Sequence, residues 1–123
     1  MKFAEADSSA GHLIQGYEPG RVVIDGRTYS EGLIVSPRRL VTGWGPAAAE
    51  DLVAEHLGAL IELAPQVIVL GTGTRQVFPA PAVTRAALAR GIGVEIMDTG
   101  AACRTYNILM GEGRKVVAGL MMG

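Results

Sequence analysis

The chain has 123 residues, of which 49% are hydrophobic and 19% are charged, and its formal net charge is −1. This length corresponds to one ordinary domain, and the composition is that of a globular chain and not of a disordered one. The charge balance gives no electrostatic footprint for nucleic acid, and aromatic residues, at 5%, are too few for single-strand stacking platforms.

The single cysteine, Cys103, can form no internal disulfide and fits a reducing compartment, so we expect a cytoplasmic protein. The first residues lack the apolar core of a secretory signal, and no apolar run approaches the ~20 residues of a spanning helix. We therefore expect a protein that is not integral to a membrane. His12 and His56 have no partners at ligand spacing, so the sequence predicts no metal site and no cofactor.

The first part of the chain is predicted to be rich in strands. Short β-prone runs cover residues 12–17, 21–25, 27–30, 33–36 and 39–44. Asp25-Gly26 is a type I′ hairpin signal, because both central positions of that turn need a positive φ. We therefore expect an N-terminal β-hairpin region, with its strands between about residues 12 and 44.

The part from 46 to 122 alternates helices with strands. Helices are expected from Pro46 to before Pro65, near 81–90 and near 101–112, and strands at 66–70, 93–98 and 115–122. Residues 66–70 are almost continuously apolar, which is typical of a strand that is buried on both faces. The alternation predicts a single α/β domain over residues 1–123, with a sheet that has a parallel part.

Gly71-Thr72-Gly73 follows the apolar strand, where an α/β protein often holds a nucleotide. A dinucleotide fingerprint needs a third glycine, which Gln76 replaces, and a helix that follows directly, which Pro79 and Pro81 delay. A P-loop is excluded because no Gly-Lys-Ser/Thr follows. The pattern favours a tight turn.

A weaker ligand-binding interpretation stays open for the same residues. Ligands bind at the carboxyl ends of strands in open α/β sheets, and two such ends are Gly71–Gly73 and Asp98–Gly100. If the two strands are neighbours, Gly71–Gly73 and Thr99–Arg104 form one crevice. The helix that begins at Ala101 or Ala102 would offer free amide groups to an anion there.

Three residues of the third helix are further candidates. Cys103 is interpreted as a small buried hydrophobe in preference to a reactive thiolate, since no histidine lies nearby in the sequence. Asn107 is expected to clamp a neighbouring loop, such as 71–73, or to contact a ligand. Arg104 is either an anion contact or a solvated side chain. The candidate ligand-binding residues are Gly71, Thr72, Gly73, Thr99, Cys103, Arg104 and Asn107, and none is assigned a catalytic role.

Several motifs occur in a characteristic order. They are Val67–Gly73, Gly91–Glu95, Met97–Thr99, Ala102-Cys103, Thr105–Asn107 and Glu112–Arg114. This set resembles the small α/β family that includes mitochondrial complex I assembly factor 3 and the adipogenesis-associated Mth-type domain proteins, over roughly residues 13 to 122. The resemblance implies a three-layer fold around a mixed sheet that helices flank, and no established catalytic activity. Mitochondrial members act as assembly partners for a respiratory complex.

Two hypotheses of function follow. The first is a binding or assembly module that engages an unidentified protein partner, and it rests on the resemblance and on the lack of a complete catalytic constellation. The alternative is a small-molecule or anion-binding protein, with enzymatic activity left open, whose crevice lies at Gly71–Gly73 and Thr99–Arg104. A homo-oligomer is compatible with both hypotheses.

Overall fold

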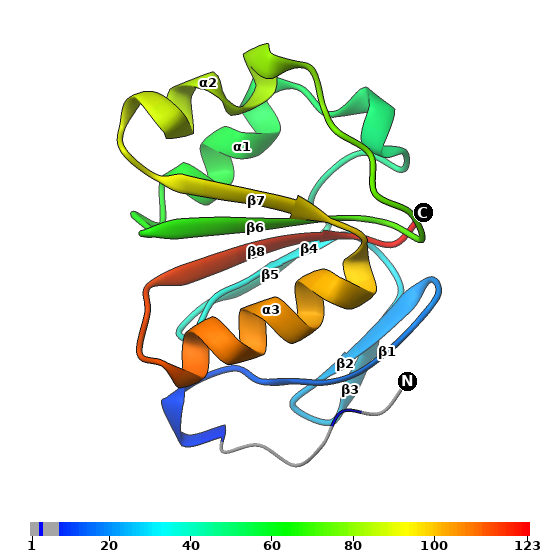
Figure 1. Ribbon diagram of the computed structural model, residues 1–123. Helices are drawn as coiled ribbons and strands as arrows, with labels where there is room; N and C mark the ends of the chain where they lie inside the picture. Colours follow the sequence, from blue (N-terminus) through cyan, green and yellow to red (C-terminus); the bar gives the residue numbers. More distant parts are fainter. Residues whose placement is uncertain (1–2, 4–7) are drawn as a thin grey trace.

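The protein has three layers (Figure 1). The computed structural model describes residue 3 and residues 8–123. One layer holds two helices, the middle layer is a five-stranded sheet, and the third layer combines one helix with a three-stranded sheet. This arrangement confirms the predicted three-layer α/β fold with an added N-terminal β region.

The N-terminal part forms the small antiparallel sheet. A short 3-10 turn, η1 (Ser8–Ala10), precedes β1 (Ile14–Glu18), β2 (Arg21–Ile24) and β3 (Arg27–Tyr29). The turn between β2 and β3 has a positive φ at both central positions, 52° at Asp25 and 79° at Gly26, which confirms the hairpin prediction. Val22 and Ile24 of β2 are fully buried, so one face of this sheet packs toward the interior.

The larger sheet consists of β4 (Leu33–Val35), β5 (Leu40–Thr42), β6 (Val67–Thr72), β7 (Gly93–Met97) and β8 (Val116–Met121), in the spatial order β5-β4-β8-β6-β7. β6 runs parallel to β7 and β8, whereas β4 is antiparallel to β8 and β5. Every residue of β6 is buried, because layers cover both faces of the sheet. The predicted mixed sheet with a parallel part is therefore correct.

The helices are α1 (Ala54–Ile61), α2 (Pro81–Ala89) and α3 (Thr99–Gly111), with a short 3-10 turn, η2 (Ala49–Asp51), before α1. The expectation of a helix from Pro46 is wrong, because Leu52 and Val53 are extended and separate η2 from α1. His56 stabilises the late start, since its Nδ1 accepts a hydrogen bond from the Val53 N–H (3.0 Å).

The five-stranded sheet separates two apolar clusters. One cluster joins α3, the three-stranded sheet and one face of the large sheet, and its largest buried member is Tyr106. The other joins α1, α2 and the opposite face, and it includes Trp44, whose indole N–H donates to the carbonyl of His56 (3.0 Å). The sheet is therefore the shared wall of both halves of the core.

Candidate functional site

The predicted crevice residues meet at the carboxyl end of β6, where α3 begins. The Thr99 hydroxyl donates to the backbone carbonyl of Met121 (2.6 Å) and accepts from the backbone N–H of Gly73 (2.8 Å). The Thr99 N–H donates to the Gly73 carbonyl (2.8 Å). Thr99 is fully buried, so this side chain joins the ends of β6 and β8 to the first turn of α3.

Gly71 and Gly73 allow close approach of the backbone. A Cβ at Gly71 would lie 2.9 Å from Thr99 Oγ1 and 3.1 Å from the Cβ of Ala102. Gly73 has a φ of 97°, and a Cβ there would lie 1.9 Å from the carbonyl oxygen of Gly123. The space beside both glycines is thus occupied by protein atoms, and Gly73 has the turn conformation that favours glycine.

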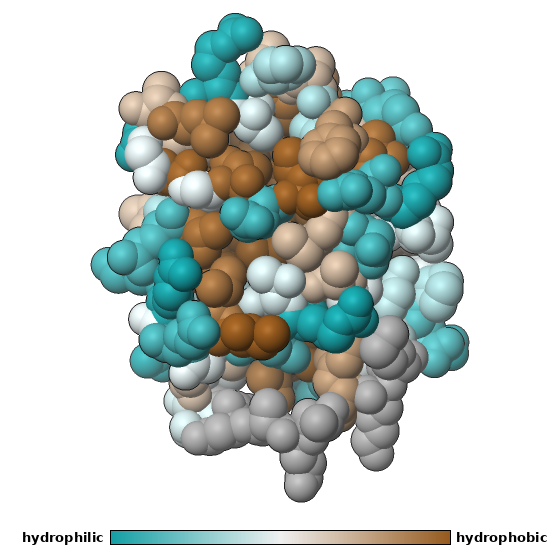
Figure 2. Space-filling view, in the orientation of Figure 1, coloured by the Kyte–Doolittle hydropathy of each residue, from teal (hydrophilic) through white to brown (hydrophobic). Residues whose placement is uncertain are grey.

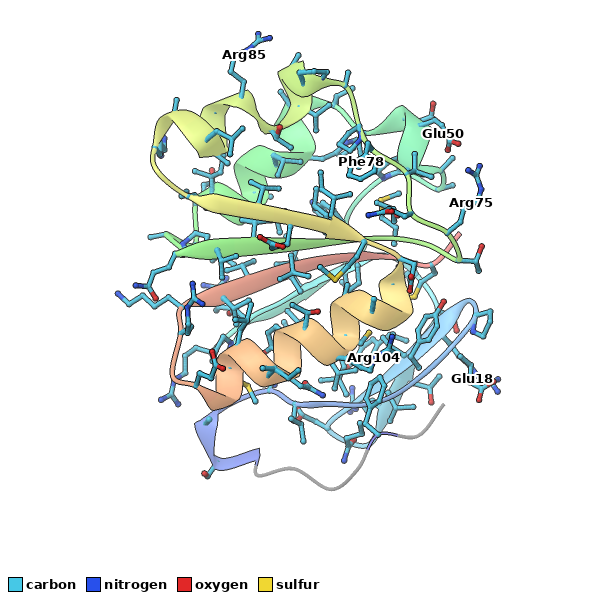
Figure 3. The ribbon with its side chains drawn as sticks, viewed as in Figure 1. Glu18, Glu50, Arg75, Phe78, Arg85 and Arg104 are labelled. Carbon is cyan, nitrogen blue, oxygen red and sulfur yellow. The ribbon has the colours of Figure 1, made fainter. Side chains whose placement is uncertain are left out.

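Thr72 organises the loop that follows β6. Its hydroxyl donates to the carbonyl of Arg75 (2.7 Å) and accepts from the N–H of Val77 (3.0 Å). The Arg75 side chain points outward to Glu50, at 3.0 Å between Nη2 and Oε2, and Figure 3 shows this exposed pair. Such an exposed ion pair contributes little to stability.

The N-terminus of α3 differs from the expectation of free amide groups at Ala101 and beyond. The helix begins at Thr99, and Asp98 is its N-cap, with Oδ1 accepting from the Ala101 N–H (2.9 Å). The Thr99 N–H is bound to Gly73. A carboxylate of the chain itself therefore already takes the place that an external anion would need.

Cys103 is fully buried on the inner face of α3. Burial raises the pKa of the thiol to about 12, and the positive charge of Arg104 offsets only part of that rise. The thiol is therefore protonated at neutral pH, which supports the interpretation as a small buried hydrophobe. Arg104 lies on the exposed side of α3 (Figure 3).

Asn107 is a clamp, but not for the loop 71–73. Its Oδ1 accepts from the Ile14 N–H (3.0 Å), and its Nδ2 donates to the Ile14 carbonyl (2.8 Å). The oxygen and the nitrogen of the Asn107 side-chain amide thus both bind the backbone at the start of β1, 93 residues away in the sequence. The structure therefore brings Gly71, Gly73 and Thr99 together and places Asn107 elsewhere. Ligand binding by the candidate residues stays a prediction.

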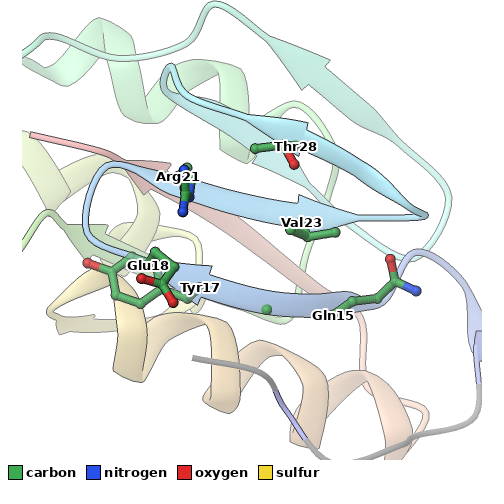
Figure 4. A pocket seen from close by; sticks show the side chains of 7 residues that line it. Gln15, Tyr17, Glu18, Arg21, Val23 and Thr28 are labelled. Carbon is green, nitrogen blue, oxygen red and sulfur yellow. The ribbon is translucent and has the colours of Figure 1, made fainter.

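A hollow of about 480 Å³ lies on the three-stranded sheet, at a place that the sequence analysis did not identify (Figure 4). It is lined by Gln15, Gly16, Tyr17, Glu18, Arg21, Val23 and Thr28. Glu18 and Arg21 are register partners on β1 and β2, and burial is the main cause that raises the pKa of Tyr17. One carboxylate and one guanidinium on neighbouring strands do not form a general acid and base pair.

Apolar side chains gather over α2 and the edge strand β7, as Figure 2 shows in brown. We call this region the α2–β7 surface and define it by Val77, Phe78, Leu88, Val94 and Ile96. Phe78 is 69% exposed and Leu88 is 58% exposed, while the other three are half-buried. Within the described residues, β7 pairs only with β6, so its outer edge adjoins this surface.

The loop before α2 covers part of that outer edge. Gln76 Nε2 donates to the carbonyl of Ile96 (2.9 Å). Sequence reasoning missed this surface, although Leu88 lies outside the stripe of Val83 and Ala87 that packs inward. The helical periodicity of α2 is the sequence signal that could have indicated an outward-facing Leu88.

Two further features concern clusters of metal-ligating side chains and the length of the helices. No three His, Cys, Asp or Glu side chains in residue 3 and residues 8–123 are placed to hold a metal ion. No helix in that part of the chain has the length and apolar character needed to cross a membrane.

The fold, with the contact of Thr99 to the ends of β6 and β8, is that of a small α/β domain. The chain belongs to the family described as a protein of unknown function (DUF498/DUF598), whose family model matches residues 14–121. It resembles the solved structure of a Mth938-like domain from Bordetella pertussis, at 31% identity and a TM-score of 0.83, over 99% of this chain and 92% of that one.

Two relatives carry names that bear on function. NADH dehydrogenase (ubiquinone) 1 alpha subcomplex assembly factor 3 of Danio rerio is 35% identical, over 98% of this chain and 70% of that protein. The 13 kDa major membrane protein of Francisella tularensis is 26% identical, over 94% of this chain and 95% of that protein. The resemblance to the assembly factor family is therefore confirmed.

Proposed function

We propose that this protein is a non-catalytic binding module that docks on a protein partner during assembly of a respiratory or other membrane complex. The observation that carries the proposal is the α2–β7 surface, where two large apolar side chains are mainly exposed beside the outer edge of β7, part of which is covered by the loop before α2. An exposed apolar group of this kind is typical of a protein–protein interaction site. The lone buried thiol fits action in the cytoplasm.

The chemistry of the strand-end region supports binding over catalysis. The Thr99 hydroxyl has both a donor and an acceptor partner within the protein, and the Cys103 thiol is held protonated by burial. No candidate nucleophile there is activated by a neighbouring base. The name of the Danio rerio relative supports an assembly role, and the name of the Francisella tularensis relative supports a place of action at a membrane.

Native mass spectrometry of the tagged protein, purified gently from its native cells, tests the proposal. We expect a co-purifying protein with the wild type, and its loss in the double variant Phe78→Ser/Leu88→Ser. Both residues are mainly exposed, so the substitutions should change stability by no more than about 0.5 kcal/mol each. Ile108→Ser is the matched control, because Ile108 is 61% exposed on α3 and should retain the partner.

Three results would contradict the proposal. They are a wild-type protein without any partner, a partner that the double variant retains, and loss of the partner in Ile108→Ser as well. A second copy of the chain as the only bound mass would identify self-association as the function of the surface. A reproducible small added mass would favour the alternative ligand site at Gly71–Gly73 and Thr99–Arg104.

A further inference from the structure

A groove of about 550 Å³ lies at the end of the five-stranded sheet opposite to the Thr99 contact. The hairpin between β4 and β5, the segment between α1 and β6, and the segment between α3 and β8 form its walls. We call it the basic groove. It is lined by Ala10, Ser36, Pro37, Arg38, Arg39, Leu63, Ala64, Pro65, Met110, Gly113, Arg114, Lys115, Val116 and Val117.

Among the described residues, four cationic side chains and no carboxylate line the basic groove. They are Arg38, Arg39, Arg114 and Lys115, and together they are 4 of the 11 Lys and Arg residues of a chain whose net charge is −1. All four are exposed. Within the described residues, none of their side chains makes a hydrogen bond or an ion pair, so their donors face solvent.

The dipole of α3 accounts for only half of this charge. Arg114 and Lys115 follow the C-terminus of α3, where positive charge is favourable. Arg38 and Arg39 lie in a strand-to-strand hairpin and compensate no helix. The hairpin is held by its own contact, because the Ser36 hydroxyl accepts from the Arg39 N–H (3.1 Å). The two cationic pairs therefore converge from independent loops.

The groove also offers apolar contact between its cations. Leu63 is half-buried, while Pro65, Met110 and Val116 are buried and contribute to its lining. A purely ionic surface would need no such lining. An apolar side chain of a peptide, in contrast, is stabilised when it leaves water for an apolar lining. Glu62 and Glu112 lie in the same connections but do not line the groove.

We propose that the basic groove binds an acidic segment of a protein partner, with carboxylates paired to the cationic rim and an apolar side chain on the lining. Arginine clusters recognise acidic motifs in this way, because the guanidinium fork matches a carboxylate. This inference rests on the proposed function and specifies the chemistry of the partner. The concave lining favours a segment over a flat lipid surface, and no aromatic residue among those that the structure describes lines the groove for base stacking.

The test is a titration of the full ¹⁵N-labelled chain with defined probes, followed by amide chemical shifts. Three synthetic peptides of equal length are compared: one with Glu and Leu, one with Lys and Leu, and one with Glu and Ser. Phosphatidylglycerol vesicles are the fourth probe. We expect only the Glu and Leu peptide to bind strongly, with shifts at the amides of Arg39, Gly113 and Lys115, and with affinity that falls as salt rises.

Charge reversal in the groove provides the matched comparison. Arg114→Glu/Lys115→Glu and, independently, Arg38→Glu/Arg39→Glu should each weaken binding by about tenfold or more, since attraction becomes repulsion. Arg85→Glu/Arg90→Glu makes the same change of net charge at exposed positions in and beside α2 and should leave affinity unchanged. The ¹⁵N spectrum of each variant reports whether it is folded.

The outcomes separate this proposal from the proposed function. Absence of peptide binding, equal binding of the Lys and Leu peptide, or unchanged affinity in folded groove variants would overturn the groove proposal. Binding only to vesicles would assign the groove to lipid phosphates instead. A native partner that is lost in Phe78→Ser/Leu88→Ser but retained by both groove variants would refute the groove and leave the assembly module standing.

Discussion

At the scale of single residues, Thr99 illustrates how one buried hydroxyl can hold three elements. Thr99→Val keeps the shape but leaves the Gly73 N–H and the Met121 carbonyl without their partner. We expect a loss of about 2 to 4 kcal/mol in the free energy of unfolding, measured by urea denaturation. Thr84→Val is the control, because the Thr84 hydroxyl donates a long hydrogen bond (3.5 Å) to the Pro81 carbonyl of its own helix and joins no separate elements through it. An equal loss there would refute the argument.

The buried Cys103 thiol should make the protein less stable at alkaline pH. Burial raises its pKa in the folded protein to about 12 from a usual value of 9.0. The folded thiol therefore holds its proton at a pH where the unfolded thiol has lost it. The contribution of the thiol to the free energy of unfolding is therefore fully present below pH 9. It decreases as the pH rises from 9 toward 12, by about 1.4 kcal/mol per pH unit.

Urea denaturation at a series of pH values from neutral to alkaline checks this prediction. Burial also raises the pKa of Tyr106, so the wild type should lose stability more steeply than the thiol alone requires. Cys103→Ala should remove the contribution of the thiol and leave a shallower slope. A variant with the same slope as the wild type would show that the thiol does not titrate differently on unfolding.

At the scale of elements, Gly71 decides how closely α3 approaches β6. In Gly71→Ala the new methyl group would lie 3.0 Å from the Cα of Thr99, a backbone atom that cannot turn away. We expect a cost of about 1 to 3 kcal/mol. Gly58→Ala in α1 meets no atom within 4 Å and should stabilise by about 0.5 to 1 kcal/mol. Thermal unfolding of both variants measures the contrast, and equal shifts would disprove the close-contact argument.

Asn107 connects the three-stranded sheet to α3 through two hydrogen bonds to Ile14. Asn107→Ala should therefore cost about 1 to 3 kcal/mol and lower hydrogen-exchange protection in β1 and β2 more than in β6 and β8. Asn107→Asp keeps an acceptor for the Ile14 N–H but places a carboxylate oxygen against the Ile14 carbonyl oxygen, so it should cost at least as much as Asn107→Ala. Uniform loss of protection across both sheets would contradict a local clamp.

The elements that the sequence predicted best are those with strong local signals. Periodicity located α2 and α3, the apolar run located β6, and Asp25-Gly26 located the hairpin. The first helix was placed too early, because Pro46 is compatible with a helix start and nothing local shows that Leu52 and Val53 are extended. That break depends on tertiary packing of Leu52, which a local pattern does not contain.

At the scale of the whole molecule, the surfaces were the least predictable part. The cations of the basic groove come from two segments that are more than 70 residues apart in the sequence, Arg38-Arg39 and Arg114-Lys115. Only the antiparallel pairing of β4 with β8 brings them to one end of the sheet. The Asn107 contact with Ile14 has the same origin in topology. Residue type was visible in the sequence, whereas the partner across space was not.

The shared sheet predicts that the molecule unfolds as one unit. Successive residues of β6 alternate between the clusters, with Val69 in that of α3 and Ile68 in that of α1 and α2. Neither half can open without exposing the other, so fluorescence of Trp44 and labelling of Cys103 by a thiol reagent should report the same urea midpoint. Labelling of Cys103 at urea concentrations where Trp44 fluorescence is still native would show that the α3 layer unfolds separately.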